Sequence, residues 1–81
     1  MAELDTKTKE MVALAASVAG NCIPCLRHHF QEAIKANCTK QEIQEVIEIA
    51  NMVKQRPAQL INEAAAGLMQ RVKKEVHHDN E

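Results

Sequence analysis

The stretch from Met11 to Ala19 constrains the fold of this 81-residue chain most strongly, because Ser17 is its only polar residue. Asp5 and Thr6 are candidate N-caps for a helix that runs through this stretch. A helix that is apolar on almost every side must be enclosed by other elements. Gly20 follows directly and is expected to end the helix in the left-handed conformation.

A second helix is predicted from about Cys22 to Ala36, with Asn21 as its cap and Asn37 as its terminator. Its apolar residues recur at helical spacing, at Leu26, Phe30, Ala33 and Ile34. Because the connection through Gly20 and Asn21 is short, the first two helices are expected to form an antiparallel hairpin.

Two more helices are predicted in the second half of the chain. Thr39 and Glu42 have the spacing of a capping box, which would begin a third helix from about Lys40 to Lys54. Arg56-Pro57 interrupts the pattern, because proline disfavours a helical residue before it and suits a first turn. A fourth helix is therefore predicted from about Pro57 to Val76.

Four helices with short connections and no strand signal predict an all-α fold. We expect a single domain over residues 1–81, with residues 76–81 as a frayed tail. The apolar faces exceed what four short helices can cover for one another, so the sequence also predicts a homo-oligomer.

Charge and composition argue against several function classes. The chain has 10 basic and 11 acidic residues, for a net charge of −1, and Phe30 is its only aromatic residue. This leaves no basic patch and no stacking platform for nucleic acid. No apolar run approaches the roughly 20 residues of a membrane span, and the first residues do not resemble a signal peptide. We therefore expect a cytoplasmic protein with reduced cysteines.

The sequence Cys22-Ile23-Pro24-Cys25 precedes two histidines, His28 and His29. At a helix start, free N–H groups and the helix dipole favour a thiolate, and Pro24 suits a first turn. His29 follows Cys25 by four residues and shares its face, whereas His28 lies on a neighbouring face. A thiol next to an imidazole at this position predicts a reactive cysteine.

Hairpin geometry adds a carboxylate to this group. In an antiparallel pair joined at Gly20, His29 lies opposite the level of Val12, within one turn of Glu10. Glu10 is the last charge before the apolar stretch, where a carboxylate favours a specific partner. A relay of Glu10, His29 and Cys25 follows, with Cys22 completing the group.

The order of Glu10, Cys22, Cys25 and His29 resembles the active-site pattern of the AhpD (alkylhydroperoxidase) branch of the carboxymuconolactone decarboxylase-like family. The family spacing E-x(11)-C-x-x-C-x(3)-H is met at all four positions, and the similarity covers roughly residues 4 to 56. The resemblance implies that Cys25 is the attacking thiol, that Cys22 resolves it as a Cys22–Cys25 disulfide, and that His29 with Glu10 moves the proton.

The resemblance further implies a helical thiol–disulfide oxidoreductase that reduces disulfides or hydroperoxides without an organic cofactor. Electrons would come from a dithiol protein that is thioredoxin-like or carries a lipoyl group, and the assembly would be a trimer or a hexamer. One departure matters, because studied AhpD members carry a histidine between the cysteines where this chain has Pro24. Dithiol–disulfide exchange is therefore favoured over peroxide reduction, which also needs a proton for the leaving hydroxyl.

Two other interpretations of these residues stay open. Cys22, Cys25 and either His28 or His29 have ligand types suited to zinc or iron, with Glu10 or a second subunit as the fourth ligand. Alternatively, the chain is a redox-inactive oligomerisation domain. The third cysteine, Cys38, is expected to be a partly buried thiol, or otherwise to form an intersubunit or regulatory disulfide.

Overall fold

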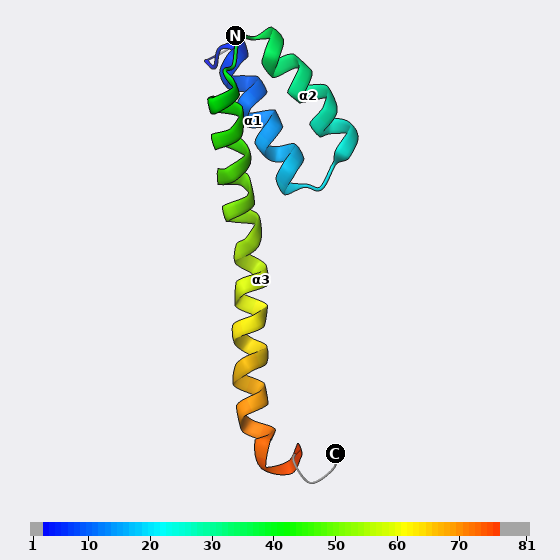
Figure 1. Cartoon of the computed structure of the whole chain (residues 1–81), viewed down its shortest axis with the longest axis vertical. Helices are drawn as coiled ribbons and strands as arrows, with labels where there is room; N and C mark the ends of the chain where they lie inside the picture. The colour runs from blue at the N-terminus through cyan, green and yellow to red at the C-terminus, as the bar shows by residue number, and fades with distance from the viewer. Residues whose placement is uncertain (1–2, 77–81) are drawn as a thin grey trace.

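The computed structural model describes residues 3–76, which form three helices and no strand. These are α1 (Thr6–Ala19), α2 (Ile23–Lys35) and α3 (Lys40–Val76) (Figure 1). The all-α prediction is confirmed, but the prediction of four helices is wrong, because α3 continues through Pro57. The predicted frayed tail lies, apart from Val76, outside the described residues.

α3 is one helix because a break at Pro57 would cost more than the proline does. A proline inside a helix removes one backbone hydrogen bond and costs about 3 kcal/mol. A break would instead leave four carbonyls and four N–H groups without partners inside a helix. The residues around Pro57 are exposed, so its ring meets no packed neighbour.

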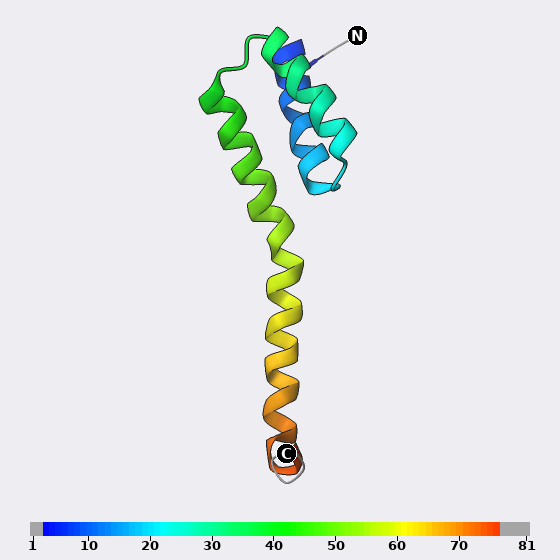
Figure 2. The same ribbon diagram turned by 45° about the vertical axis from the view of Figure 1, so that its right-hand side comes forward.

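α1 and α2 run in opposite directions side by side, and only the first part of α3 lies against them (Figures 1 and 2). The rest of α3 extends beyond them, and the molecule measures 63 Å along its longest axis and 23 Å across. No helix within residues 3–76 is both long enough and apolar enough to cross a bilayer.

α1 begins and ends in recognisable capping structures. Asp5, one of the two candidate caps, is the N-cap, and its carboxylate accepts the N–H of Thr8 at 2.8 Å. At the other end, the N–H of Cys22 reaches the carbonyl of Ser17 at 3.0 Å, which is the long bond of a Schellman motif.

The left-handed residue of this turn is Asn21, with φ of 57°, so the prediction for Gly20 is wrong. Gly20 has φ of −89°. It suits its position because a Cβ there would lie 3.1 Å from the carbonyl oxygen of Ala16. Asn tolerates the left-handed conformation better than most residues because its short polar side chain can hydrogen-bond locally.

α2 ends in the same kind of turn. Asn37 has φ of 69°, and the N–H of Cys38 reaches the carbonyl of Ala33 at 3.0 Å. The predicted capping box follows and is confirmed: Glu42 accepts the N–H of Thr39 at 2.8 Å, and Thr39 accepts the N–H of Glu42 at 3.0 Å.

The core lies where all three helices meet. Its buried cluster consists of Leu14, Ala33, Cys38 and Ile43. α1 is not enclosed as predicted, since the side chain of Val12 is 57% exposed. α3 is buried at Ile43 and Ala50 but exposed from residue 55 to residue 72. Single-chain packing therefore leaves one side of α1 and the second half of α3 uncovered.

Candidate active site

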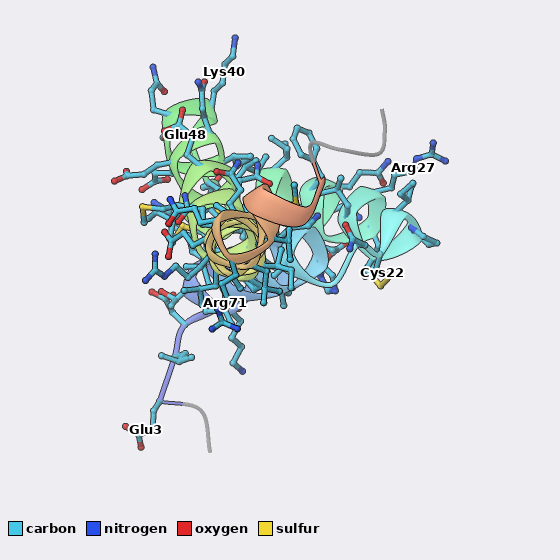
Figure 3. The ribbon with its side chains drawn as sticks, turned by 90° about the horizontal axis from the view of Figure 1, so that it is seen from below. Glu3, Cys22, Arg27, Lys40, Glu48 and Arg71 are labelled. Carbon is cyan, nitrogen blue, oxygen red and sulfur yellow. A yellow bond between two sulfur atoms is a disulfide. The ribbon has the colours of Figure 1, made fainter. Side chains whose placement is uncertain are left out.

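Cys22 and Cys25 are joined by a disulfide across the first turn of α2, with their Cα atoms 5.2 Å apart. Cys22 is the N-cap of α2, where Asn21 was predicted, because Asn21 is occupied in ending α1. Both cysteines are partly exposed. Figure 3, viewed along α3, places Cys22 at the edge of the molecule, away from α3. The pair is therefore accessible to a reactant from solvent.

The start of α2 favours negative charge on the sulfur of Cys22. The Sγ atom accepts the N–H of Cys25 at 3.3 Å. Pro24 occupies the first turn, as predicted, where its missing N–H removes no helical bond. Because a helix N-terminus stabilises anions, a thiolate formed at Cys22 on reduction would keep this hydrogen bond and gain from the dipole.

Glu10 and His29 form a carboxylate–imidazole pair between α1 and α2. Glu10 Oε1 and His29 Nδ1 are 2.8 Å apart, and their side chains are 19% and 29% exposed. A carboxylate can only accept hydrogen bonds, so Nδ1 carries the proton. In the neutral ring, Nε2 then has the free lone pair of a base. The pair also bridges α1 to α2, the helix whose start carries both cysteines.

The structure thus brings the four predicted residues together as two pairs. His29 follows Cys25 by one turn of α2, but no hydrogen bond among the described residues joins His29 to either sulfur. His28 is exposed, and its ring lies edge-on to that of His29 with the centroids 4.8 Å apart. The imidazole and the disulfide therefore lie one helical turn apart on α2 and are not joined by a hydrogen bond among the described residues.

Within residues 3–72, no three His, Cys, Asp or Glu side chains are arranged to hold a metal ion. The sulfurs of Cys22 and Cys25 bond to each other, and a thiolate, not a disulfide, is the metal ligand. A metal would therefore require reduction of the pair first.

Cys38 lies apart from this region. Its side chain is 7% exposed, and its Sγ approaches the carbonyl oxygen of Lys7 at 3.9 Å. Burial raises the pKa of the Cys38 thiol, and the nearby carboxylate of Glu42 raises it further. The sequence predicted partial burial, whereas the structure makes this thiol part of the core.

Lys54 is a residue at the site that sequence reasoning missed. Its ammonium group donates to the carbonyl of Val18 at 3.1 Å and to Oδ1 of Asn21, immediately before Cys22. The available signal was a cation facing the end of a helix, where unpaired carbonyls favour positive charge. Val18 lies 36 residues before Lys54 in the sequence, so sequence spacing alone does not identify the contact.

Comparison with known protein families places these residues in a family. Residues 2–70 match the model of the carboxymuconolactone decarboxylase family, and this range contains Glu10, Cys22, Cys25 and His29. The match confirms the family resemblance of the sequence. Neither the curated proteins nor the solved structures contain a match to the chain.

Proposed function

Because this chain belongs to the carboxymuconolactone decarboxylase family, which includes AhpD-like proteins, we propose that it is a thiol–disulfide oxidoreductase. The observation that carries the proposal is the accessible Cys22–Cys25 disulfide at a helix N-terminus beside the Glu10–His29 pair. A structural disulfide that closes so short a loop constrains the unfolded chain little compared with one that closes a long loop. Its position therefore suits exchange better than stabilisation.

In the proposed reaction, the Cys25 thiolate attacks one sulfur of a substrate disulfide, and the other substrate sulfur leaves as a thiolate. The Cys22 thiolate then attacks Cys25 Sγ, releases the second substrate thiolate and forms the Cys22–Cys25 disulfide. A dithiol donor reduces this disulfide by the same chemistry in reverse. Two electrons pass from donor to substrate in each cycle, and no organic cofactor takes part.

The hydrogen bond at Cys22 supports this division of roles. A sulfur leaves faster from a disulfide when its thiol has a lower pKa. Because Cys22 Sγ accepts the N–H of Cys25, it is the better leaving group. An incoming donor thiolate would then attack Cys25, which is also the sulfur that exchanges with substrate.

His29 is the proposed base. Glu10 holds the proton on Nδ1, so Nε2 is free to accept the proton of the Cys25 thiol, one helical turn away. The resulting imidazolium would be stabilised by the carboxylate of Glu10. His29 then returns the proton to a departing substrate thiolate.

Hydroperoxide reduction is a second reaction for the same residues. The Cys25 thiolate would attack the peroxide, becoming a sulfenic acid and releasing an alcohol once the leaving oxygen is protonated. The Cys22 thiol would then form the disulfide and release water. Pro24 offers no proton between the cysteines, so we expect this reaction to be slower than disulfide exchange.

We further propose that the partners are a dithiol protein, thioredoxin-like or lipoyl-bearing, and other copies of this chain, in a reducing compartment such as the cytoplasm. The projecting part of α3, residues 55–72, is called the arm below. It exposes five large apolar side chains: Leu60, Ile61, Leu68, Met69 and Val72. Side chains of this kind carry roughly 60–120 Å² of apolar surface each, so the arm offers about 300–600 Å².

A second copy is the proposed cover for the arm. An open apolar groove of about 620 Å³ lies between α2 and α3 and includes Phe30, Ile34 and Ile47 in its walls. The first part of α3 forms one wall of the groove, so the arm cannot fold back into it without breaking the helix. A second copy that covers both the arm and the groove would bury more apolar surface than the arm alone, toward the roughly 800 Å² per partner of a stable interface.

Exchange activity tests the proposed function directly. The reduced chain and its Cys25→Ser variant are compared in turnover of a small aromatic disulfide with dithiothreitol as donor, with Cys38→Ser as the matched control. We expect Cys25→Ser to abolish the enzyme-dependent rate and Cys38→Ser to retain it. Full activity of Cys25→Ser, or stoichiometric zinc or iron with unreactive thiols, would rule the proposal out.

The assembly is tested by sedimentation velocity. Ile61→Glu with Leu68→Glu should reduce the oligomer to a monomer. Gln59→Glu with Gln70→Glu, which adds the same charge to the opposite face of the arm, should not. Equal sedimentation of the two double variants would contradict the arm as the interface.

A further inference from the structure

Lys54 links the second half of the chain to the redox turn. Its ammonium group donates to the carbonyl of Val18 at 3.1 Å and to the side-chain oxygen of Asn21. Within α3 up to residue 72, Lys54 is also the last residue of intermediate exposure, and every residue after it is classed as exposed. It therefore stands where α3 leaves the hairpin and contacts the residue that precedes Cys22.

The contact holds a turn that is costly to form. Asn21 adopts the left-handed conformation, which is unfavourable for residues other than glycine. The carbonyl of Val18 already accepts the N–H of Asn21 at 3.2 Å, and the ammonium group adds a second, charged donor to it. A cation at the end of a helix is favourable in itself. Lys54 thus contacts both residues that this hydrogen bond joins, Val18 and Asn21.

The position of Cys22 depends on the same turn. Its backbone N–H is bonded to the carbonyl of Ser17, and its Sγ to the N–H of Cys25. A disulfide forms more readily from two thiols that are already held close together, because less conformational entropy is lost on closing the bond. The rigidity of the turn in the reduced protein should therefore affect the redox equilibrium of the pair.

We propose that Lys54 is a positioning residue that favours the Cys22–Cys25 disulfide by holding the Asn21 turn in its closed conformation before the bond forms. This inference rests on the proposed redox function of the pair. Lys54 itself touches no reacting atom. Its effect passes through Asn21 and Val18 to the backbone of Cys22.

The test is the equilibrium of the full chain with glutathione, carried out in a Cys38→Ala background. In this reaction the dithiol and one glutathione disulfide give the Cys22–Cys25 disulfide and two molecules of glutathione. We compare Lys54→Met, which keeps an apolar stem, with Lys54→Arg, which keeps the charge. Lys9→Met is the control, because Lys9 is exposed and its side chain has no hydrogen bond or ion pair among the described residues.

We expect Lys54→Met to lower the equilibrium constant for disulfide formation about threefold to tenfold, the effect of losing one to two hydrogen bonds. Lys54→Arg should restore it to within about twofold, and Lys9→Met should leave it unchanged, on the same scale of interaction. An unchanged constant in Lys54→Met would overturn the proposal. So would a rise, which would mean that the ammonium group stabilises the reduced thiolate instead.

A second pair of variants keeps the inference testable if Lys54→Met folds poorly. Asn21→Asp keeps a residue that tolerates the left-handed conformation and turns the Lys54 contact into an ion pair, so the equilibrium constant should rise. The rise should disappear when Lys54→Gln is added. A rise that persists in the double variant would contradict the role of Lys54. Failure of the proposed function is detected separately, as full turnover by the Cys25→Ser variant, because this equilibrium does not measure turnover.

Discussion

The turns Gly20-Asn21-Cys22 and Ala36-Asn37-Cys38 have almost the same local structure but give their cysteines opposite surroundings. Each turn ends a helix with a left-handed Asn, followed by a Cys whose N–H closes the long Schellman bond. Cys22 then begins α2 at the edge of the molecule, whereas Cys38 is buried in the core. The turn therefore fixes the backbone conformation at the cysteine, whereas the packing around the cysteine determines its exposure and reactivity.

Thiol accessibility should show the largest difference between the two turns. In the folded, reduced protein, iodoacetamide should modify Cys25 or Cys22 at least about 100-fold faster than Cys38. A buried thiol must first be exposed by local opening. The raised pKa of Cys38 also lowers the fraction of it that is thiolate. Peptide mass mapping over time measures the three rates. Denaturant is the control, since it should remove most of the difference. Rapid modification of Cys38 in the folded protein would contradict its place in the core.

The sequence was sufficient to predict the features of these turns that depend on neighbouring residues. The capping box of Thr39 and Glu42 needs only a three-residue spacing and was predicted correctly, and the N-cap Asp5 was one of two candidates. The pairing of Glu10 with His29 was expected from hairpin geometry, and the two side chains are in contact. In that case a short connection fixed which levels of the two helices face each other.

Other features depend on which of two competing conformations is more stable, and sequence spacing does not indicate this. Gly20 and Asn21 both suit the left-handed position, and the close approach of Gly20 to the carbonyl of Ala16 decided between them. Pro57 was predicted to divide α3, yet the hydrogen bonds preserved on both sides outweigh the one that proline removes. The contact of Lys54 with the first turn depends on how α3 packs, which no local pattern records.

Substitution of the two Asn residues should show the next largest effect. Ala in the left-handed conformation is strained, so Asn37→Ala should lower the free energy of unfolding by about 1 kcal/mol. Asn21→Ala should cost about 2 kcal/mol, because it also removes the side-chain acceptor of Lys54. Urea unfolding of the oxidised protein measures both values. Gly at either position is the control, since it relieves the strain, and equal losses for the two Ala variants would mean that the Lys54 contact contributes nothing.

At alkaline pH, ionisation of the Cys38 thiol in the second turn should give a further difference between the two turns, in the pH dependence of stability. Burial holds the pKa of the folded thiol above its ordinary value of 9.0, so the folded state keeps the proton that the unfolded state loses first. Stability from this group is complete below about pH 9 and decreases as the pH rises through the folded pKa.

Melting temperatures measured between pH 8 and pH 10.5 should therefore fall less steeply in Cys38→Ala than in the parent chain. Glu42 also holds the folded pKa of Lys7 above its ordinary value of 10.5, so Lys7 begins to lose its proton first in the unfolded state near the top of this range, and this contribution remains in both proteins. Identical slopes would indicate that ionisation of Cys38 is not coupled to unfolding.

Acid pH should give the smallest difference, and it should act on the second turn. The N–H of Thr39 and then the ammonium group of Lys7, 3.0 Å away, lower the pKa of Glu42. The first turn has Lys54 and a neutral amide instead. Because the folded pKa of Glu42 lies below the unfolded value of 4.5, its stabilisation is present above about pH 4.5 and is lost as the pH falls through the folded pKa.

Glu42→Gln keeps the capping acceptor but not the charge, so unfolding measured from pH 6 to pH 3 should show a smaller loss of stability in the variant. Some loss should remain, because the pKa of Asp5 is also lowered by its bond to Thr8. A variant as acid-sensitive as the parent chain would place the acid-labile contacts elsewhere.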